Sequence, residues 1–119
     1  MLWIRHRDFF PDADITLRSP VIDLSGLGAG RLTFEAYRDA DGFEDVAEVS
    51  FLRASDEVQI GNAVPLDMTI FDIDWTVIDI PLPTQVLGEE IFIEWNFRSD
   101  STFDLYSGLS IDNVGIVEE

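Results

Sequence analysis

The stretch RLTFEAYR at positions 31–38 decides the class of fold, because its apolar and polar residues alternate. Alternate positions of an extended chain share one face, so this pattern gathers apolar side chains on one side and polar ones on the other. Such alternation predicts a strand with one buried face. The apolar side holds Leu32, Phe34 and Ala36, and the polar side holds Thr33, Glu35 and Tyr37.

Two later stretches repeat this pattern, VAEVSFLR at 46–53 and IFIEWNFR at 91–98. In the second, Trp95 shares its side with Ile91, Ile93 and Phe97, so we expect its ring in the core. Further strands are expected at 15–18, 20–24, 68–72, 75–80 and 109–117.

The segments between the expected strands carry turn residues, such as Ser25-Gly26, Asp41-Gly42 and Ser107-Gly108. No helical insert of about 10–15 residues separates any two strands, as a parallel βαβ fold would require. The pattern therefore predicts an all-β, antiparallel β-sandwich or barrel, and the whole chain, 1–119, is expected to form one domain.

The composition is strongly acidic and narrows the classes of partner. The 119 residues include 24 acids against seven arginines, with no lysine, which gives a formal net charge of −17. Binding to phosphate groups needs clustered cations, so neither a nucleic acid nor an anionic membrane surface is expected as a partner. No apolar run approaches the roughly 20 residues that span a bilayer, so no membrane insertion is expected. The absence of cysteine excludes disulfides and thiolate metal sites.

Several motifs occur together in a familiar order, and together they resemble the jelly-roll accessory domains of secreted bacterial proteins. These domains are similar in fold to MAM domains and to carbohydrate-binding modules. The motifs are LRSPVIDLSG at 17–26, LTFEAYRDADGFEDVAEVSF at 32–51, DWTVIDIPL at 74–82, IFIEWNFRSD at 91–100 and GLSIDNVGIVE at 108–118.

The resemblance implies a two-sheet antiparallel jelly roll within a larger multidomain protein that is secreted or displayed at the cell surface. It also implies a non-catalytic adhesion, accessory or structural module, and a structural calcium ion is common in such domains. The alternative is a carbohydrate-binding module that targets an exoenzyme to polysaccharide. A glycan or a surface protein would then be the partner, together with the neighbouring domains of the parent chain. Whether residues 1–16 complete the sandwich stays open.

Two regions contain candidate calcium ligands. The segment DADGFEDVAE at 39–48 places Asp39, Asp41 and Asp45 close together beside a glycine, and calcium prefers six to eight oxygen ligands. The alternative is an acidic, solvated loop between strands. The resemblance adds Asp112, in a terminal strand whose IDDV-like motif often reaches an ion in related domains. Asp112 could instead cap a turn or pair with an arginine.

Aromatic side chains on a polar strand face are candidate sugar-binding groups. Tyr37 lies on the same side as Glu35, and Tyr106 follows Phe103 and Asp104 in a segment that could line an edge site. The alternative for Tyr37 is ordinary packing against a neighbouring strand. Trp75 opens a strand and is interpreted as half-buried packing.

Catalysis is not expected. His6 is the only histidine, so a Ser-His-Asp triad or a multi-histidine zinc site would depend on that single residue. Two functions remain open, a glycan-binding module and a structural or adhesion module. The latter would present an exposed apolar patch or a free sheet edge instead of an aromatic site.

Overall fold

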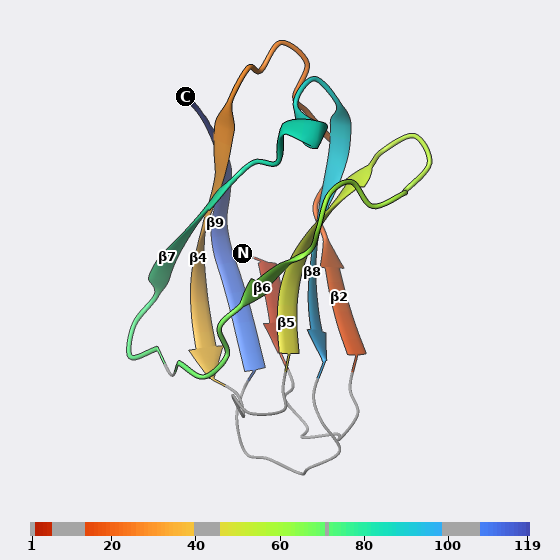
Figure 1. Ribbon diagram of the computed structural model, residues 1–119. Coiled ribbons are helices and arrows are strands. Elements are labelled where there is room, and N and C mark those ends of the chain that lie inside the picture. Colours follow the sequence, from red (N-terminus) through yellow and green to blue (C-terminus); the bar gives the residue numbers. More distant parts are fainter. Residues whose placement is uncertain (1, 6–13, 40–45, 71, 99–107) are drawn as a thin grey trace.

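The computed structural model describes residues 2–5, 14–39, 46–70, 72–98 and 108–119. Within these residues the chain is almost entirely β-structure, with a single 3-10 turn, Thr84–Val86 (Figure 1). No helix in this part of the chain is long or apolar enough to cross a membrane. The strands are β1 (Leu2–Arg5), β2 (Asp14–Arg18), β3 (Ile22–Asp23), β4 (Gly30–Asp39), β5 (Val46–Arg53), β6 (Val64–Leu66), β7 (Thr76–Pro81), β8 (Glu90–Arg98) and β9 (Gly108–Glu118).

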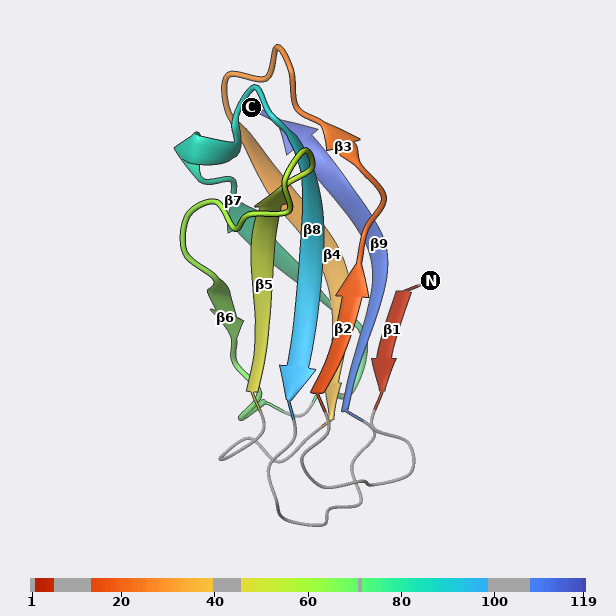
Figure 2. The same cartoon turned by 90° about the vertical axis from the view of Figure 1, so that its right-hand side faces the viewer.

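The strands form two facing antiparallel sheets. One sheet has the order β1-β9-β4-β7, and the other has the order β2-β8-β5-β6, with β3 also paired to β8 (Figures 1 and 2). The pairs are nested along the chain: β1 pairs β9, β2 pairs β8, β4 pairs β7 and β5 pairs β6. This nesting defines a jelly roll, so the predicted two-sheet antiparallel β-sandwich is confirmed.

The three alternating stretches form the strands that the sequence predicts, as β4, β5 and β8. Residues 1–16 also contribute to the sandwich, because β1 and the first part of β2 come from them. The strand expected at 68–72 is wrong for its described part. Met68 and Thr69 lie in a turn instead, in which the Asp67 carboxylate accepts the Thr69 N–H at 2.9 Å, and the strand forms earlier, as β6. Met68 is nevertheless 97% buried. A buried residue in a turn therefore produces the same sequence pattern as a buried residue in a strand.

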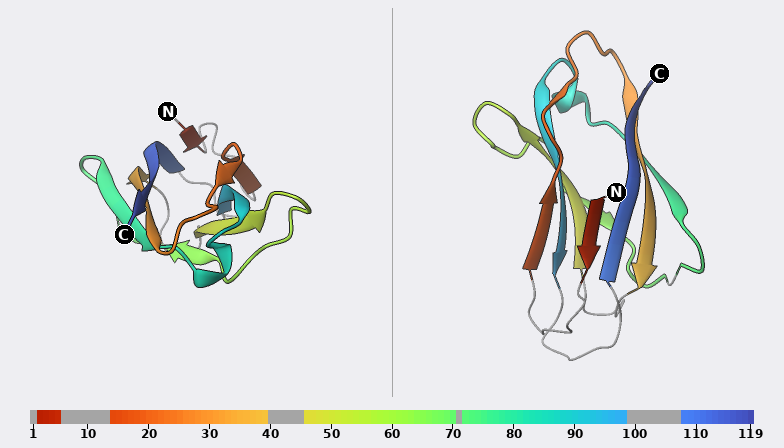
Figure 3. Two further views of the ribbon diagram at one scale, coloured as in Figure 1. Left: turned by 90° about the horizontal axis from the view of Figure 1, so that it is seen from above. Right: turned by 180° about the vertical axis from the view of Figure 1, so that it is seen from behind.

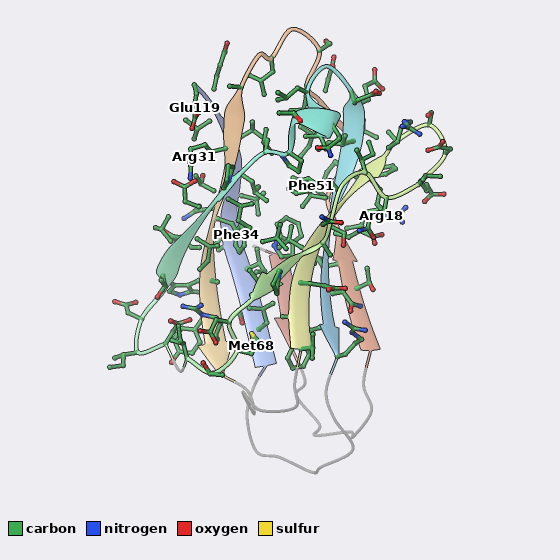
Figure 4. The ribbon with its side chains drawn as sticks, in the orientation of Figure 1. Arg18, Arg31, Phe34, Phe51, Met68 and Glu119 are labelled. Atoms are coloured by element: carbon green, nitrogen blue, oxygen red, sulfur yellow. The ribbon has the colours of Figure 1, made fainter. Side chains whose placement is uncertain are left out.

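The core lies between the two sheets and is made by the alternating residues. The inward side chains of β4 meet those of β5 and β8, and the rings of Phe34 and Trp95 contact edge to face, with centroids 5.6 Å apart. Phe34 and Phe51 point into this interior from opposite sheets (Figure 4). Burying one such ring contributes about 1.5–3 kcal/mol, so these contacts dominate the packing energy.

Candidate functional site

The outer face of the β1-β9-β4-β7 sheet carries the candidate site. Because Phe34 and its inward neighbours fill the core, the other side chains of β4 point away from it, and these include Glu35 and Tyr37. The strand register places Glu35 between Val77 of β7 and Asp112 of β9, and it places Tyr37 opposite Ser110. Two of the sequence-predicted ligand residues therefore share this face, and Asp112 lies beside them.

An aromatic pair forms one end of the face. The ring of Tyr37 lies against the ring of Trp75, with centroids 6.1 Å apart and planes inclined by 63°. Both side chains are half-buried. The sequence predicts only half-buried packing for Trp75, and the structure places it against Tyr37, in the segment just before β7. The predicted cross-strand packing of Tyr37 is therefore present, and part of its ring still reaches the surface.

Polar groups continue the face beyond the rings. The side-chain amide of Asn113 donates to Glu35 Oε2 at 2.9 Å, and Asp112 Oδ1 accepts the backbone N–H of Asn113 at 2.8 Å. The result is a row of carboxylate oxygens beside two aromatic rings, a combination that can hydrogen-bond hydroxyl groups and pack against C–H bonds.

A β-bulge places Asn113 on this face. The register between β4 and β9 shifts between Thr33 and Glu35, and Asn113 has a φ of 52°. Asn tolerates this left-handed conformation better than most residues, and a bulge redirects the side chain of the extra residue. Asn113 stands where the IDDV-like motif has its second Asp, and nothing in the local sequence pattern indicates the bulge.

A buried ion pair holds the Trp75 segment against β4. The Asp72 carboxylate accepts three hydrogen bonds from Arg38, from the backbone N–H and from Nε at 2.8 Å each and from Nη2 at 3.0 Å. The Thr76 hydroxyl donates to the same carboxylate at 2.9 Å, and the Asp72 N–H donates back to the Arg38 carbonyl at 3.0 Å. The two side chains are only 7% and 4% exposed. Trp75 therefore lies in a short loop fixed at both ends.

The pKa of Asp72 is set by these contacts. Burial alone would raise the pKa of this carboxyl, but the hydrogen bonds from Arg38 and Thr76 outweigh it and hold the pKa below its usual value of 3.8. The carboxylate is thus charged at neutral pH and neutralised by Arg38. No local sequence pattern indicates this pair, because the two residues lie 34 positions apart.

No unpaired guanidinium lies on the described part of the surface. Each arginine whose side chain the structure describes is matched to at least one acid: Arg18 to Glu57 and Glu94, Arg31 to Asp79 and Glu119, Arg38 to Asp72, Arg53 to Asp56, and Arg98 to Glu48. Figure 4 shows Arg31 and Glu119 side by side at one end of the sandwich. The outer face therefore offers acidic and aromatic groups, and an anionic ligand would find no free cation among these residues.

The predicted calcium ligands do not come together within the described residues. Asp112 lies opposite Glu35, whereas Asp39 lies opposite Gly108, four positions further along the sheet, or about 13 Å at the usual strand rise. Asp41 and Asp45 lie outside the described residues, and so does Tyr106. No group of three metal-ligating acids or histidines occurs in this part of the chain. Asp112, Glu35 and Asn113 alone supply fewer ligands than calcium needs.

Comparisons with known proteins bear on the fold. No protein-family model matches the chain, and no curated protein matches it in sequence. Among solved structures, the K1 cleaved adhesin domain of Lys-gingipain from Porphyromonas gingivalis W83 is similar in fold, with a TM-score of 0.54 and 20% identity over 91% of this chain. The match covers 65% of that domain, just under two thirds of its length. A second match is the C-terminal domain of EclA, described as a sugar-binding protein, with a TM-score of 0.47, 13% identity, and coverage of 93% of this chain and 70% of that one.

Proposed function

We propose that this chain is a non-catalytic binding module that acts in glycan recognition or adhesion, with the outer face of the β4-β7-β9 sheet as its recognition surface. The observation that carries the proposal is the Tyr37–Trp75 pair, which lies beside the Glu35 and Asp112 carboxylates on one sheet face. The fold likeness to an adhesin domain supports the same class of function.

An uncharged sugar fits this surface best. Aromatic rings pack against the C–H faces of a sugar ring, and carboxylate and amide groups accept and donate hydrogen bonds to its hydroxyls. Acidic sugars fit less well, because the described arginines are already paired and the chain carries a charge of −17. The Arg38–Asp72 pair supports the role by fixing Trp75 before a ligand arrives, which lowers the entropy lost on binding.

The absence of catalysis is part of the proposal. The chain has one histidine and no cysteine, and the aromatic and acidic groups lie on a sheet surface, where water is not excluded. Purified protein is expected to release no reducing sugar from any polysaccharide that it binds.

Binding to a surface protein is the second candidate. Next to the aromatic pair, Ile73 is 99% exposed and Val77 is 65% exposed, and such apolar side chains commonly contribute to protein contacts. Retention on protein-coated but not glycan-coated surfaces, lost in an Ile73→Ser/Val77→Ser double variant, would favour this candidate.

A glycan array followed by titration tests the main proposal. We expect the wild-type chain to bind at least one neutral polysaccharide, and Trp75→Ala to weaken binding about tenfold, the equivalent of roughly 1.4 kcal/mol. Phe92→Ala is the matched control, because Phe92 is also half-buried and points outward, but from the opposite sheet, where it lies under Arg18. Equal losses in both variants, or no binding to any glycan, would contradict the glycan proposal.

Location and calcium complete the proposal. A module of this kind would act outside the cell, secreted or at the cell surface, beside other domains of its parent protein. The acidic sequence of segment 39–48 is what supports calcium binding. An ion that binds only the folded state raises the melting temperature. The melting temperature in calcium chloride should therefore be higher than in sodium chloride at equal ionic strength. Equal melting temperatures would contradict calcium binding.

A further inference from the structure

The strand β7 forms one edge of the β1-β9-β4-β7 sheet, and it comes from the middle of the chain. It pairs with β4 on one side, and among the described residues no strand lies on its other side. Figure 1 and the right-hand view of Figure 3 show β7 at the margin of the sheet, on the side away from β1. We call Thr76–Pro81 the β7 edge.

The strand register shows which backbone groups of the β7 edge are unpaired. Just beyond the strand, the Leu82 N–H donates to the Gly30 carbonyl at 2.9 Å, and bonded pairs alternate with unbonded pairs along an antiparallel ladder. The odd-numbered positions of β7 therefore turn their backbone groups away from β4. These positions are Val77, Asp79 and Pro81, of which proline has no N–H. An added strand would find the N–H groups of the first two and the carbonyls of all three.

Exposed apolar side chains gather at the same edge. Val77 is 65% exposed on the outer face, and Ile73, just before the strand, is 99% exposed. Ile78 lies on the inner face opposite Phe34, but it is only half-buried, at the margin of the core. Proteins commonly block such an edge with lysine or proline, because it otherwise invites another strand to pair. Here Pro81 blocks one end of the edge and leaves Val77 open.

The charge around the β7 edge selects the partner. Asp74 and Asp79 are exposed beside it. Asp79 accepts a hydrogen bond from Arg31 Nε at 2.6 Å, and its carboxylate has further lone pairs for a second donor. Two copies of the chain, each with a charge of −17, would repel one another in an edge-to-edge pair. A segment that carries a cationic residue would be attracted.

We infer that the β7 edge docks an extended, cationic and apolar segment of a partner protein, which adds an antiparallel strand to this sheet. In this mode of recognition, backbone hydrogen bonds supply affinity and alternate side chains supply selectivity. The inference rests on the second candidate function above, binding to a surface protein, and specifies the partner. It does not depend on glycan binding at Tyr37 and Trp75.

The register of the edge specifies the docked segment. Residues directly opposite in an antiparallel pair lie on the same face of the sheet. The residue opposite Ile78 points inward and should be apolar, because it covers the exposed part of that side chain. The residue opposite Asp79 points outward and should be arginine or lysine, and the residue opposite Val77 should be apolar. The N–H groups of these last two residues point toward β7, whereas the N–H of the residue opposite Ile78 points away from it.

A designed peptide and two N-methylated forms of it test the inference. The probe is fluorescein-labelled Thr-Val-Arg-Ile-Val-Thr, with its arginine opposite Asp79, its isoleucine opposite Ile78 and its second valine opposite Val77. N-methylation of the arginine removes an N–H that should bond to β7, whereas N-methylation of the isoleucine removes one that points away. The two forms have the same composition and charge. Fluorescence anisotropy gives the affinities, and amide hydrogen exchange of the protein locates the bound strand.

The unmodified peptide is expected to bind saturably, and more weakly as salt is added. The form methylated at arginine should bind about tenfold more weakly, and the form methylated at isoleucine should bind nearly as well as the unmodified peptide. New amide protection is expected at Val77 and Asp79. Equal affinities of the two methylated forms, or protection that falls on β6 instead of β7, would overturn the inference.

A pair of protein variants tests the same contact from the other side. Val77→Pro removes an N–H that points away from β4, at an edge position where a strand tolerates proline. It should weaken peptide binding about fivefold or more. Val77→Thr keeps the N–H and is the matched control, with an affinity close to that of the wild type, and melting curves check that both variants fold.

The outcomes separate this inference from the functions proposed above. Retention on protein-coated surfaces that Val77→Pro does not reduce would contradict the inference and leave the second candidate function intact. Glycan binding without peptide binding would also contradict the inference alone. A dimer of the wild-type chain that Val77→Pro abolishes, as measured by sedimentation, would assign the edge to a second copy and overturn the choice of partner.

Discussion

Arg38 and Asp72 form a two-pronged ion pair, in which Nε and Nη2 of the arginine donate to the two carboxylate oxygens at 2.8 and 3.0 Å. Because both side chains are buried, water cannot take the place of a missing partner. Arg38→Met should therefore lower the free energy of unfolding by about 3–5 kcal/mol, since it leaves a buried charge without its partner. Urea denaturation measures this change. Arg53→Met, which removes an exposed pair with Asp56, is the control and should cost less than about 1 kcal/mol. Similar losses in the two variants would mean that the buried pair has no special role.

The same pair predicts how stability depends on acid. The pKa of Asp72 is lowered on folding, so its contribution to stability is complete above the unfolded-state value of 3.8 and is lost as the pH falls through the lower folded-state value. Stability should therefore change little through Asp72 between pH 7 and about pH 5, and fall steeply below about pH 4. In Asp72→Asn the acid-dependent part of the fall should be smaller, as followed by urea midpoints at each pH. An unchanged pH slope in the variant would contradict this assignment.

The bulge residue predicts a difference between two substitutions. Asn113 has a φ of 52°, which glycine adopts freely and β-branched residues avoid. Asn113→Val should lower stability by about 1–3 kcal/mol, whereas Asn113→Gly should lower it by about 1 kcal/mol or less, the value of the hydrogen bond lost to Glu35. Thermal melting of both variants checks this order, and the reverse order would show that the left-handed conformation is not maintained.

Gly28, just before β4, and Gly30, the first residue of β4, make a matched packing test. A Cβ at Gly30 would lie 3.0 Å from the Val117 carbonyl oxygen and from Leu27 Cδ2, whereas a Cβ at Gly28 would meet nothing within 4 Å. Gly30→Ala should therefore cost about 1–3 kcal/mol through overpacking, and Gly28→Ala should be close to neutral. Chemical denaturation of the two proteins distinguishes them, and equal stabilities would mean that β9 moves aside without loss.

The sequence predicts the core well, because burial of Phe34, Val49 and Trp95 follows from a two-residue period that is local. It predicts an outward Tyr37 for the same reason. Local periodicity cannot distinguish a buried turn residue from a strand residue, so Met68 was assigned to a strand.

The remaining parts of the candidate site depend on contacts between distant segments. The partnership of Tyr37 with Trp75, the bulge at Asn113 and the Arg38–Asp72 pair all arise from strand pairing across the sheet. No spacing rule within one segment encodes these contacts, so no local pattern identifies Trp75 as a member of the site.

The nested order of the strands also constrains how the chain reaches its native state. Since β1 pairs with β9, the two ends of the chain must meet before the first sheet is complete. Contacts between residues so far apart require the closure of long loops before they contribute any energy, which slows folding in sandwiches of this kind. During synthesis, β1 and β4 cannot be joined into one sheet until β9 has left the ribosome, because β9 lies between them.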